Sequence, residues 1–115
     1  MPTKDITTSP TLVMDSNRNR TSIIINNLDG NDAVGILDDP TMTYNQKSVQ
    51  LTGGQSYSLS IGSAIVGYEF AAKRINGTIK YLEQPVYDNQ RWVTGAWYLI
   101  ASTGTQSISW QSIYR

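Results

Sequence analysis

The two glutamates of this chain, Glu69 and Glu83, are the side chains whose type best suits catalysis. A pair of carboxyl groups flanking a glycosidic bond is what glycoside hydrolysis requires. That chemistry also needs a substrate cleft and two acids in different environments, for which a 115-residue chain has little room. The sequence contains neither histidine nor cysteine, so it lacks the commonest general base and a thiolate nucleophile. We therefore expect no enzymatic activity, no catalytic residue and no cofactor.

A second group of carboxylates lies between residues 29 and 39. Asp29-Gly-Asn-Asp32 and Asp38-Asp39 could supply the oxygen ligands that calcium prefers. Their spacing does not fit the twelve-residue calcium loop, and no glutamate closes the segment. Asp, Asn and Gly also satisfy backbone groups in tight turns. We predict two polar turns on either side of one strand, and no metal site.

The last third of the chain holds a concentration of aromatic residues. Flat rings on a sheet stack on sugars or on a protein partner, and they also pack in cores. If this region forms a strand, Trp97 and Leu99 share one face and Tyr98 and Ile100 share the other. With one face in the core, some rings are left for the outside. Core packing, a protein interface and a glycan-binding platform are all open for these aromatic residues.

The composition predicts a neutral, all-β protein. Lys+Arg and Asp+Glu number 9 each, and this balance argues against nucleic acid as a partner. Ile, Val and Thr make up about a quarter of the chain, which favours pleated strands. The apolar runs are far shorter than the roughly 18 residues of a membrane span, so we expect no membrane partner. Residues 1–40 carry 3 basic and 6 acidic side chains and residues 41–115 carry 6 and 3, which would suit contact between copies.

The positions of these residues depend on the strands that carry them. We predict about eight short strands in an antiparallel β-sandwich or jelly roll, with a small barrel as the alternative. Residues 20–27 form the clearest strand. Because successive side chains point to opposite faces, Ile24 in the run Ile23-Ile24-Ile25 either lies under a second layer or points outward into a partner. Residues 64–75 are open between helix and strand, since residues 69–75 have a helix-like composition.

Three turn sequences predict β-hairpins, because Gly and Asn-Gly adopt the positive φ angles of tight turns. The turns are Gly53-Gly54, Asn76-Gly77 and Thr103-Gly-Thr105. The predicted hairpins pair residues 48–52 with 55–61, the segment before Asn76 with residues 78–82, and residues 91–102 with 106–114.

The N-terminal segment differs from the rest of the chain. Residues 1–10 are polar and contain two prolines, which predicts a flexible or extended arm, whereas residues 11–115 form a single β-sandwich domain. The segment lacks the apolar core of a signal peptide, so we expect the protein to be made in a cytoplasm. The arm, the outward isoleucine and the late aromatic residues supply the candidate partner contacts. These candidates are Lys4, Ile6, Ile24, Trp92, Trp97, Tyr98 and Trp110.

The stretch from residue 12 to residue 59 resembles small β-sandwich virion proteins of tailed bacteriophages. The resemblance rests on a short strand followed by an Asn-Arg repeat and a β-branched strand, and then on two further motifs. The Asn-Arg repeat is Asn17-Arg-Asn-Arg20, and the β-branched strand after it ends at Asn26-Asn27. The two further motifs are Ala33-Val-Gly-Ile36 and Val49-Gln-Leu-Thr-Gly-Gly-Gln-Ser-Tyr57. The aromatic segment from Arg91 onward lies outside the resemblance.

The resemblance implies a structural protein of the virion, with no catalytic residue to carry over. It implies a capsid decoration or cement protein that binds the major capsid protein, or another virion protein, on the outer shell. A neck, tail or head-fibre component is the first alternative, and a carbohydrate- or receptor-binding β-module is the second. We expect a homo-oligomer on the capsid surface, assembled in the host cytoplasm.

Overall fold

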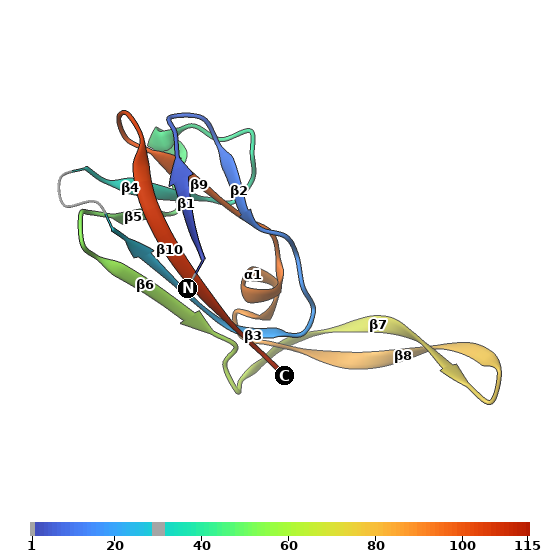
Figure 1. The fold of residues 1–115 in the computed structure, drawn as a ribbon. Coiled ribbons are helices and arrows are strands. Elements are labelled where there is room, and N and C mark those ends of the chain that lie inside the picture. Colours follow the sequence, from blue (N-terminus) through green and yellow to red (C-terminus); the bar gives the residue numbers. More distant parts are fainter. Residues whose placement is uncertain (1, 29–31) are drawn as a thin grey trace.

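The computed structural model describes residues 2–28 and 32–115. Its architecture is an antiparallel β-sandwich, as predicted, with one long hairpin projecting from it (Figure 1). The sandwich strands are β1 (Thr3–Ile6), β2 (Thr11–Met14), β3 (Arg20–Asn27), β4 (Val34–Leu37), β5 (Val49–Leu51), β6 (Ser56–Ser60), β9 (Trp97–Ala101) and β10 (Gln106–Tyr114). The remaining elements are the short 3-10 helix η1 (Tyr44–Gln46), β7 (Ile65–Ile75), β8 (Thr78–Tyr87) and the helix α1 (Gln90–Thr94).

The sandwich consists of two four-stranded sheets. The first sheet has the order β1-β10-β3-β6, and the second has the order β2-β9-β4-β5. The chain passes from one sheet to the other at every connection within the sandwich except the one between β4 and β5. The paired strands are antiparallel.

The core lies between the sheets and is built from alternate side chains of their strands. Ile23 and Ile25 are fully buried, whereas Ile24 between them points to the outer face of the first sheet and is half-buried. Of the two arrangements predicted for the isoleucine run, the outward one is therefore found. The apolar core further contains Ile6, Val13, Met14, Val34, Ile36, Leu51, Trp97, Leu99, Ala101 and Ile108.

Two of the three predicted hairpins are wrong. β5 pairs with β4 and β6 pairs with β3, so the turn at Gly53-Gly54 carries the chain between sheets. The turn after β9 does the same, because β9 belongs to the second sheet and β10 to the first. Gly54 and Gly104 do have positive φ angles, but a local turn conformation does not fix which strands pair. The segment before Gly95 forms α1 rather than a strand.

The hairpin at Asn76-Gly77 is confirmed. Both turn residues have positive φ angles, 51° and 78°, and β7 runs antiparallel to β8 on either side of them. The helical alternative for residues 64–75 is wrong, since Ile65–Ile75 is a strand. Cross-strand pairing overrides the helix-like composition of this segment.

The N-terminal segment is extended rather than free. Thr3–Ile6 forms the edge strand β1 against β10, and Ile6 is 0% exposed in the core. Ile6 is therefore a core residue and not a surface for a partner, because its apolar side chain gains more from this chain's own sandwich. Lys4 is exposed, and its Nζ donates to the carbonyl oxygen of Leu12 at 2.9 Å.

Candidate docking site

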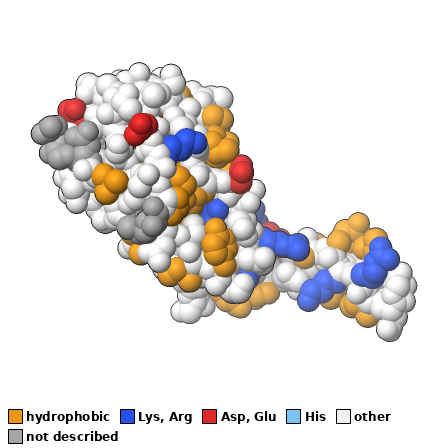
Figure 2. All heavy atoms as spheres, in the orientation of Figure 1, with side chains coloured by type: hydrophobic (Ala, Val, Ile, Leu, Met, Phe, Trp, Pro, Cys, Tyr) orange, Lys and Arg blue, Asp and Glu red, His pale blue; other side chains and the backbone are white. Residues whose placement is uncertain are grey.

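The β7–β8 hairpin is the part of the molecule most open to another protein. It forms its own two-stranded sheet and extends away from the sandwich, so the molecule measures 56 × 25 × 24 Å. Figure 1 shows the hairpin leaving one end of the sandwich, and Figure 2 shows apolar and basic side chains exposed along it. An isolated two-stranded hairpin is marginally stable in water, so a hairpin of this length is better suited to a bound state.

The register of the hairpin gives it two different faces. Tyr68 and Phe70 alternate along β7, and Ile79 and Tyr81 of β8 lie on the same face, opposite Arg74 and Ala72. These four side chains share one face, which we call the aromatic face, together with Ala72, Arg74, Glu83 and Pro85. Tyr68, Phe70 and Tyr81 are 60%, 74% and 72% exposed. Large apolar side chains clustered in this way mark an interaction surface.

The opposite face of the hairpin is more polar. It carries Glu69, Lys73, Lys80, Gln84 and the smaller apolar side chains of Ala71, Ile75 and Leu82. Lys73 and Lys80 lie directly across from each other. Like charges in this position destabilise a strand pair unless a counter-charge is brought near.

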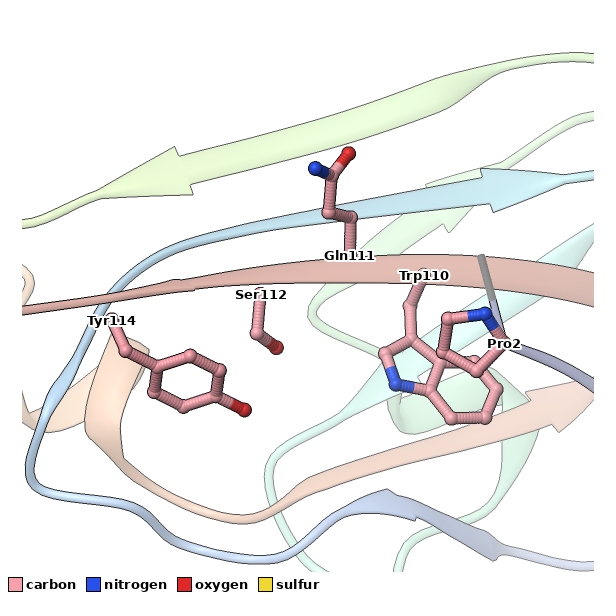
Figure 3. A pocket seen from close by; sticks show the side chains of 5 residues that line it. All are labelled: Pro2, Trp110, Gln111, Ser112 and Tyr114. Atoms are coloured by element: carbon pink, nitrogen blue, oxygen red, sulfur yellow. The ribbon is translucent and has the colours of Figure 1, made fainter.

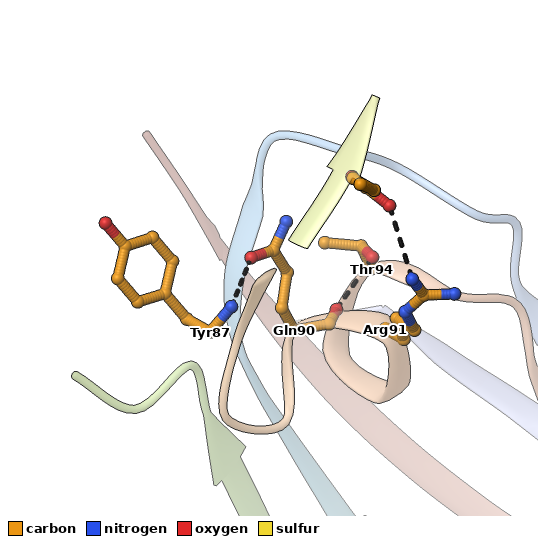
Figure 4. Close-up of polar contacts among 5 residues, drawn as sticks. Tyr87, Gln90, Arg91 and Thr94 are labelled. Carbon is orange, nitrogen blue, oxygen red and sulfur yellow. Dashed lines mark hydrogen bonds and ion pairs between the residues drawn. The ribbon is translucent and has the colours of Figure 1, made fainter. Parts of the chain in front are cut away.

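Helix α1 braces the base of the hairpin (Figure 4). The side-chain Oε1 of Gln90 accepts from the backbone N–H of Tyr87 at 2.9 Å, and the Thr94 hydroxyl donates to the Gln90 carbonyl at 2.7 Å. Arg91 donates to Glu69 of β7 at 3.5 Å, with both side chains largely exposed. An exposed pair of this kind contributes little to stability, so the hydrogen bond from the Tyr87 backbone to the Gln90 side chain does more to join α1 to β8.

A buried arginine fixes α1 to the sandwich. The Arg20 guanidinium donates from Nη1 to the carbonyls of Val93 and Gly95 at 3.1 and 3.0 Å. Its Nη2 donates to the carbonyl of Asp15 at 2.6 Å. Carbonyls at a helix C-terminus carry partial negative charge, which favours a cation there. Arg20 thereby joins β3 to the segment that carries the hairpin.

Of the tryptophans predicted as partner contacts, Trp97 lies in the core, whereas Trp92 and Trp110 are half-buried and pack against it. Trp97 is 2% exposed and packs edge-on against the half-buried Trp92, with ring centroids 5.2 Å apart. The ring centroids of Tyr57 and Trp97 are 6.3 Å apart. Trp97 is therefore a core residue, and Trp92 packs against the core rather than forming an open platform.

Trp110 lines an open hollow at the end of β10. The hollow has a volume of about 390 Å³ and is bordered by Pro2, Trp110, Gln111, Ser112 and Tyr114. Figure 3 shows Trp110, Ser112 and Tyr114 on the same side of the strand, with Gln111 pointing away. The Ser112 hydroxyl donates to the sulfur of Met14 at 3.2 Å. Because a thioether sulfur is a weak acceptor, the hydroxyl remains able to bind a polar ligand.

The other residues predicted as partner contacts lie in different parts of the sandwich. Ile24 lies on the outer face of the first sheet between Gln111 and Ser58. Tyr98 is half-buried in β9 of the second sheet, and Lys4 lies at the β1 edge. The seven predicted residues therefore form no single site.

The two glutamates are not arranged for hydrolysis. Glu69 lies opposite Gln84, and Glu83 lies opposite Phe70, so adjacent register positions place the two carboxylates on opposite faces of the hairpin. They cannot flank one bond from these positions.

The acidic turns use their carboxylates locally. Asp38 accepts from the Ser48 hydroxyl at 2.6 Å, and Asp39 accepts from the hydroxyl and the backbone N–H of Thr41. The hydrogen bonds from Thr41 lower the pKa of Asp39 below its ordinary value. Residues 29–31 of the segment considered for calcium lie outside the described residues. Across residues 2–28 and 32–115, no group of three or more Asp and Glu residues is placed to hold a metal ion.

The sequence contained a signal for the hairpin face. Tyr68-Glu69-Phe70 before the Asn76-Gly77 turn and Ile79-Lys80-Tyr81 after it alternate apolar and polar residues, which is the pattern of a strand with one apolar face. That pattern normally marks core, so exposure of the face could not be read from it.

Comparison of the chain with known protein families, curated proteins and solved structures gives no match. In the described part of the chain, no helix has the length and apolar character needed to cross a bilayer.

Proposed function

We propose that the protein is a non-enzymatic structural component of a bacteriophage particle that docks on the outer shell through the aromatic face of its hairpin. The observation that carries this proposal is the exposure of Tyr68, Phe70 and Tyr81 on a hairpin that its own sandwich leaves uncovered. The face holds one cation, Arg74, and one anion, Glu83, so the partner is an apolar protein surface with little net charge.

The order of the strands supports the same proposal. Numbered along the chain without the hairpin, the eight sandwich strands have the orders 1-8-3-6 and 2-7-4-5. We infer a jelly roll from this order, an architecture found in viral capsid proteins and in lectins. The sandwich is then the rigid body, and the hairpin between β6 and β9 is the attachment. The shell protein that receives it is the major capsid protein in this proposal, and a neck, tail or head-fibre position is the alternative within the particle.

The test is incorporation of the protein into particles. We expect the Phe70→Ser, Tyr81→Ser double variant to fold normally, because both side chains are exposed, and to be at least about tenfold depleted from purified particles. Particles are assembled in cells that supply only one form of the protein, and copy number is measured by quantitative mass spectrometry.

The matched control is the Leu12→Ser, Ile113→Ser double variant, which removes two apolar side chains exposed on the sandwich. It should retain the wild-type copy number. Absence of the wild-type protein from particles, or equal depletion of both double variants, would overturn the proposal. A wild-type copy number in the hundreds supports a place on the shell, and one near a dozen supports the neck or tail.

The hollow beside Trp110 favours carbohydrate binding as a second candidate function. Trp110 and Tyr114 present rings on the same side of β10, with the Ser112 hydroxyl between them (Figure 3). Rings stack on the apolar faces of sugars, and a hydroxyl positions their polar groups.

If the hollow binds glycans, Tyr114→Ala should weaken binding at least about tenfold without loss of stability, since Tyr114 is exposed. Binding is measured on a glycan array and then by calorimetry, with Tyr98→Ala as the control outside the hollow. An array on which the wild-type protein binds no glycan excludes this function.

A further inference from the structure

Strand β7 has an open edge along most of its length. Among the described residues it pairs with β8 alone, on one side, and these two strands make up their sheet. An exposed edge of this length presents unpaired backbone N–H and C=O groups to other strands. This edge is distinct from the aromatic face, which carries the proposed docking function.

The turn determines which backbone groups face outward. Asn76-Gly77 is a two-residue loop, so Ile75 and Thr78 form the hydrogen-bonded pair that closes it. Hydrogen-bonded and non-hydrogen-bonded pairs then alternate along the two strands. The non-hydrogen-bonded residues of β7 point their backbone N–H and C=O groups to its free edge, and these residues are Tyr68, Phe70, Ala72 and Arg74. By the same alternation Pro85 faces the free edge of β8, where it offers no N–H. The β7 edge is therefore the better template for another strand.

The side chains of β7 are complementary to their own sequence in one antiparallel register. If a second copy of β7 is centred on Ala71, Glu69 lies opposite Lys73 of the second copy, and Lys73 lies opposite its Glu69. Centring on Phe70 would place Lys73 opposite Gly67, and centring on Ala72 would place it opposite Ala71. These two neighbouring registers form no charge pair.

In the same register, Phe70 lies beside the small Ala72 of the second copy, and Arg74 lies beside its Tyr68, where a guanidinium can stack on a ring. Ile75 lies opposite Gly67, so the tip of one hairpin ends at the base of the other. A two-fold axis perpendicular to the sheet keeps both aromatic faces on one side.

The charges within one hairpin also favour pairing with a second copy of β7. Lys73 and Lys80 lie directly across from each other, and Glu69 is the acidic residue nearest to them on that face. A carboxylate from a second copy placed beside Lys73 would relieve the repulsion between the two lysines.

We propose that two copies of this chain pair antiparallel through their β7 edges, with the two-fold axis at Ala71, to form a four-stranded sheet. The interface is isologous, so each contact occurs twice. The dimer presents two aromatic faces as one continuous surface.

The first experiment uses the absence of cysteine from the natural sequence. Ala71 lies in a non-hydrogen-bonded pair with Ala71 of the second copy, where Cα atoms are about 4.5 Å apart, within disulfide range. We expect purified Ala71→Cys protein to form a covalent dimer on mild oxidation. The matched control is Ala72→Cys, whose two copies would be offset along the strand beyond the roughly 7 Å limit, so it should form little covalent dimer.

The second experiment reverses the charges. Lys73→Glu and Glu69→Lys each place like charges across the axis and should raise the dimer dissociation constant about tenfold or more in analytical ultracentrifugation. The Glu69→Lys, Lys73→Glu double variant should recover the wild-type constant. Arg18→Glu makes the same change of charge at an exposed position on the sandwich and should have no effect.

Wild-type protein that sediments as a monomer up to its solubility limit would overturn the proposal. Equal cross-linking at positions 71 and 72, or a double variant that fails to recover, would also overturn it, because dimers would then form through another surface or register. Both experiments use the purified protein alone, so their failure is distinguishable from failure to bind particles.

Discussion

Replacing Trp97 with alanine is expected to lower the free energy of unfolding by about 4 kcal/mol. The side chain is 2% exposed, belongs to the apolar core, and packs against the rings of Trp92 and Tyr57. Its loss removes apolar burial and leaves a cavity that neighbouring strands fill only partly. The total stability of a domain of this size is roughly 5–15 kcal/mol, so the change is large. Urea denaturation followed by far-UV circular dichroism measures it.

Two further variants make the Trp97 experiment specific. Among the described residues the indole Nε1 of Trp97 has no hydrogen-bond partner, so Trp97→Phe forfeits no bond and should cost only about 1.5 kcal/mol. Tyr114→Ala truncates an exposed ring and should stay within about 0.5 kcal/mol of wild type. A loss below about 1 kcal/mol for Trp97→Ala would contradict its place in the core.

Replacing Arg20 with methionine is expected to destabilise the protein by about 3 kcal/mol. Arg20 is 2% exposed, and its three hydrogen bonds satisfy the carbonyls of Asp15, Val93 and Gly95. Methionine fills a similar volume but leaves those acceptors without their charged donor. Because two of the carbonyls belong to the segment around α1, the base of the hairpin should loosen as well. Chemical denaturation gives the stability, and hydrogen exchange at residues 90–97 gives the local effect.

The controls for Arg20 separate charge from geometry. Arg18→Met removes an exposed guanidinium two residues away and should change stability by less than about 0.5 kcal/mol. Arg20→Lys keeps the charge but replaces the planar fork with one ammonium, so it should recover only part of the loss. Wild-type stability for Arg20→Met would mean that desolvation of the guanidinium cancels its hydrogen bonds.

The docking face and the open edge of the hairpin are complementary parts of one proposal for assembly. Pairing of two β7 strands closes an edge that would otherwise pair with unrelated strands. It also doubles the aromatic surface available to a shell, and two linked faces bind a repetitive lattice more tightly than one.

The sequence predicted the local conformation of this protein more reliably than its strand pairing. The alternation around Ile23 and Ile25 identified core residues, and Asn76-Gly77 identified a hairpin. The Gly53-Gly54 turn was recognised as a turn, but the strands on either side of it belong to different sheets. A turn sequence sets φ and ψ over a few residues, whereas the partner of a strand is set by residues far along the chain.

The candidate site was less accessible to prediction than the fold. Ile6 and Trp97 were candidate partner contacts, with core packing left open for Trp97, and both lie in this chain's own core. Phe70 and Tyr81, which form the exposed face, have the same aromatic character as the buried rings. Burial of an aromatic residue depends on whether another layer covers its strand, and that is a property of the assembled sandwich.

By itself the sequence determined that the chain is all-β, where its tight turns lie, and which face of β3 is apolar. Each of these follows from side-chain type and the two-residue period of a strand, which act locally. Only the tertiary structure decided which strands of the sandwich pair, that Trp97 is enclosed, and that β7 and β8 are left uncovered. Those outcomes depend on which layers meet in space, because the same alternating pattern is compatible with a covered strand and with an exposed one.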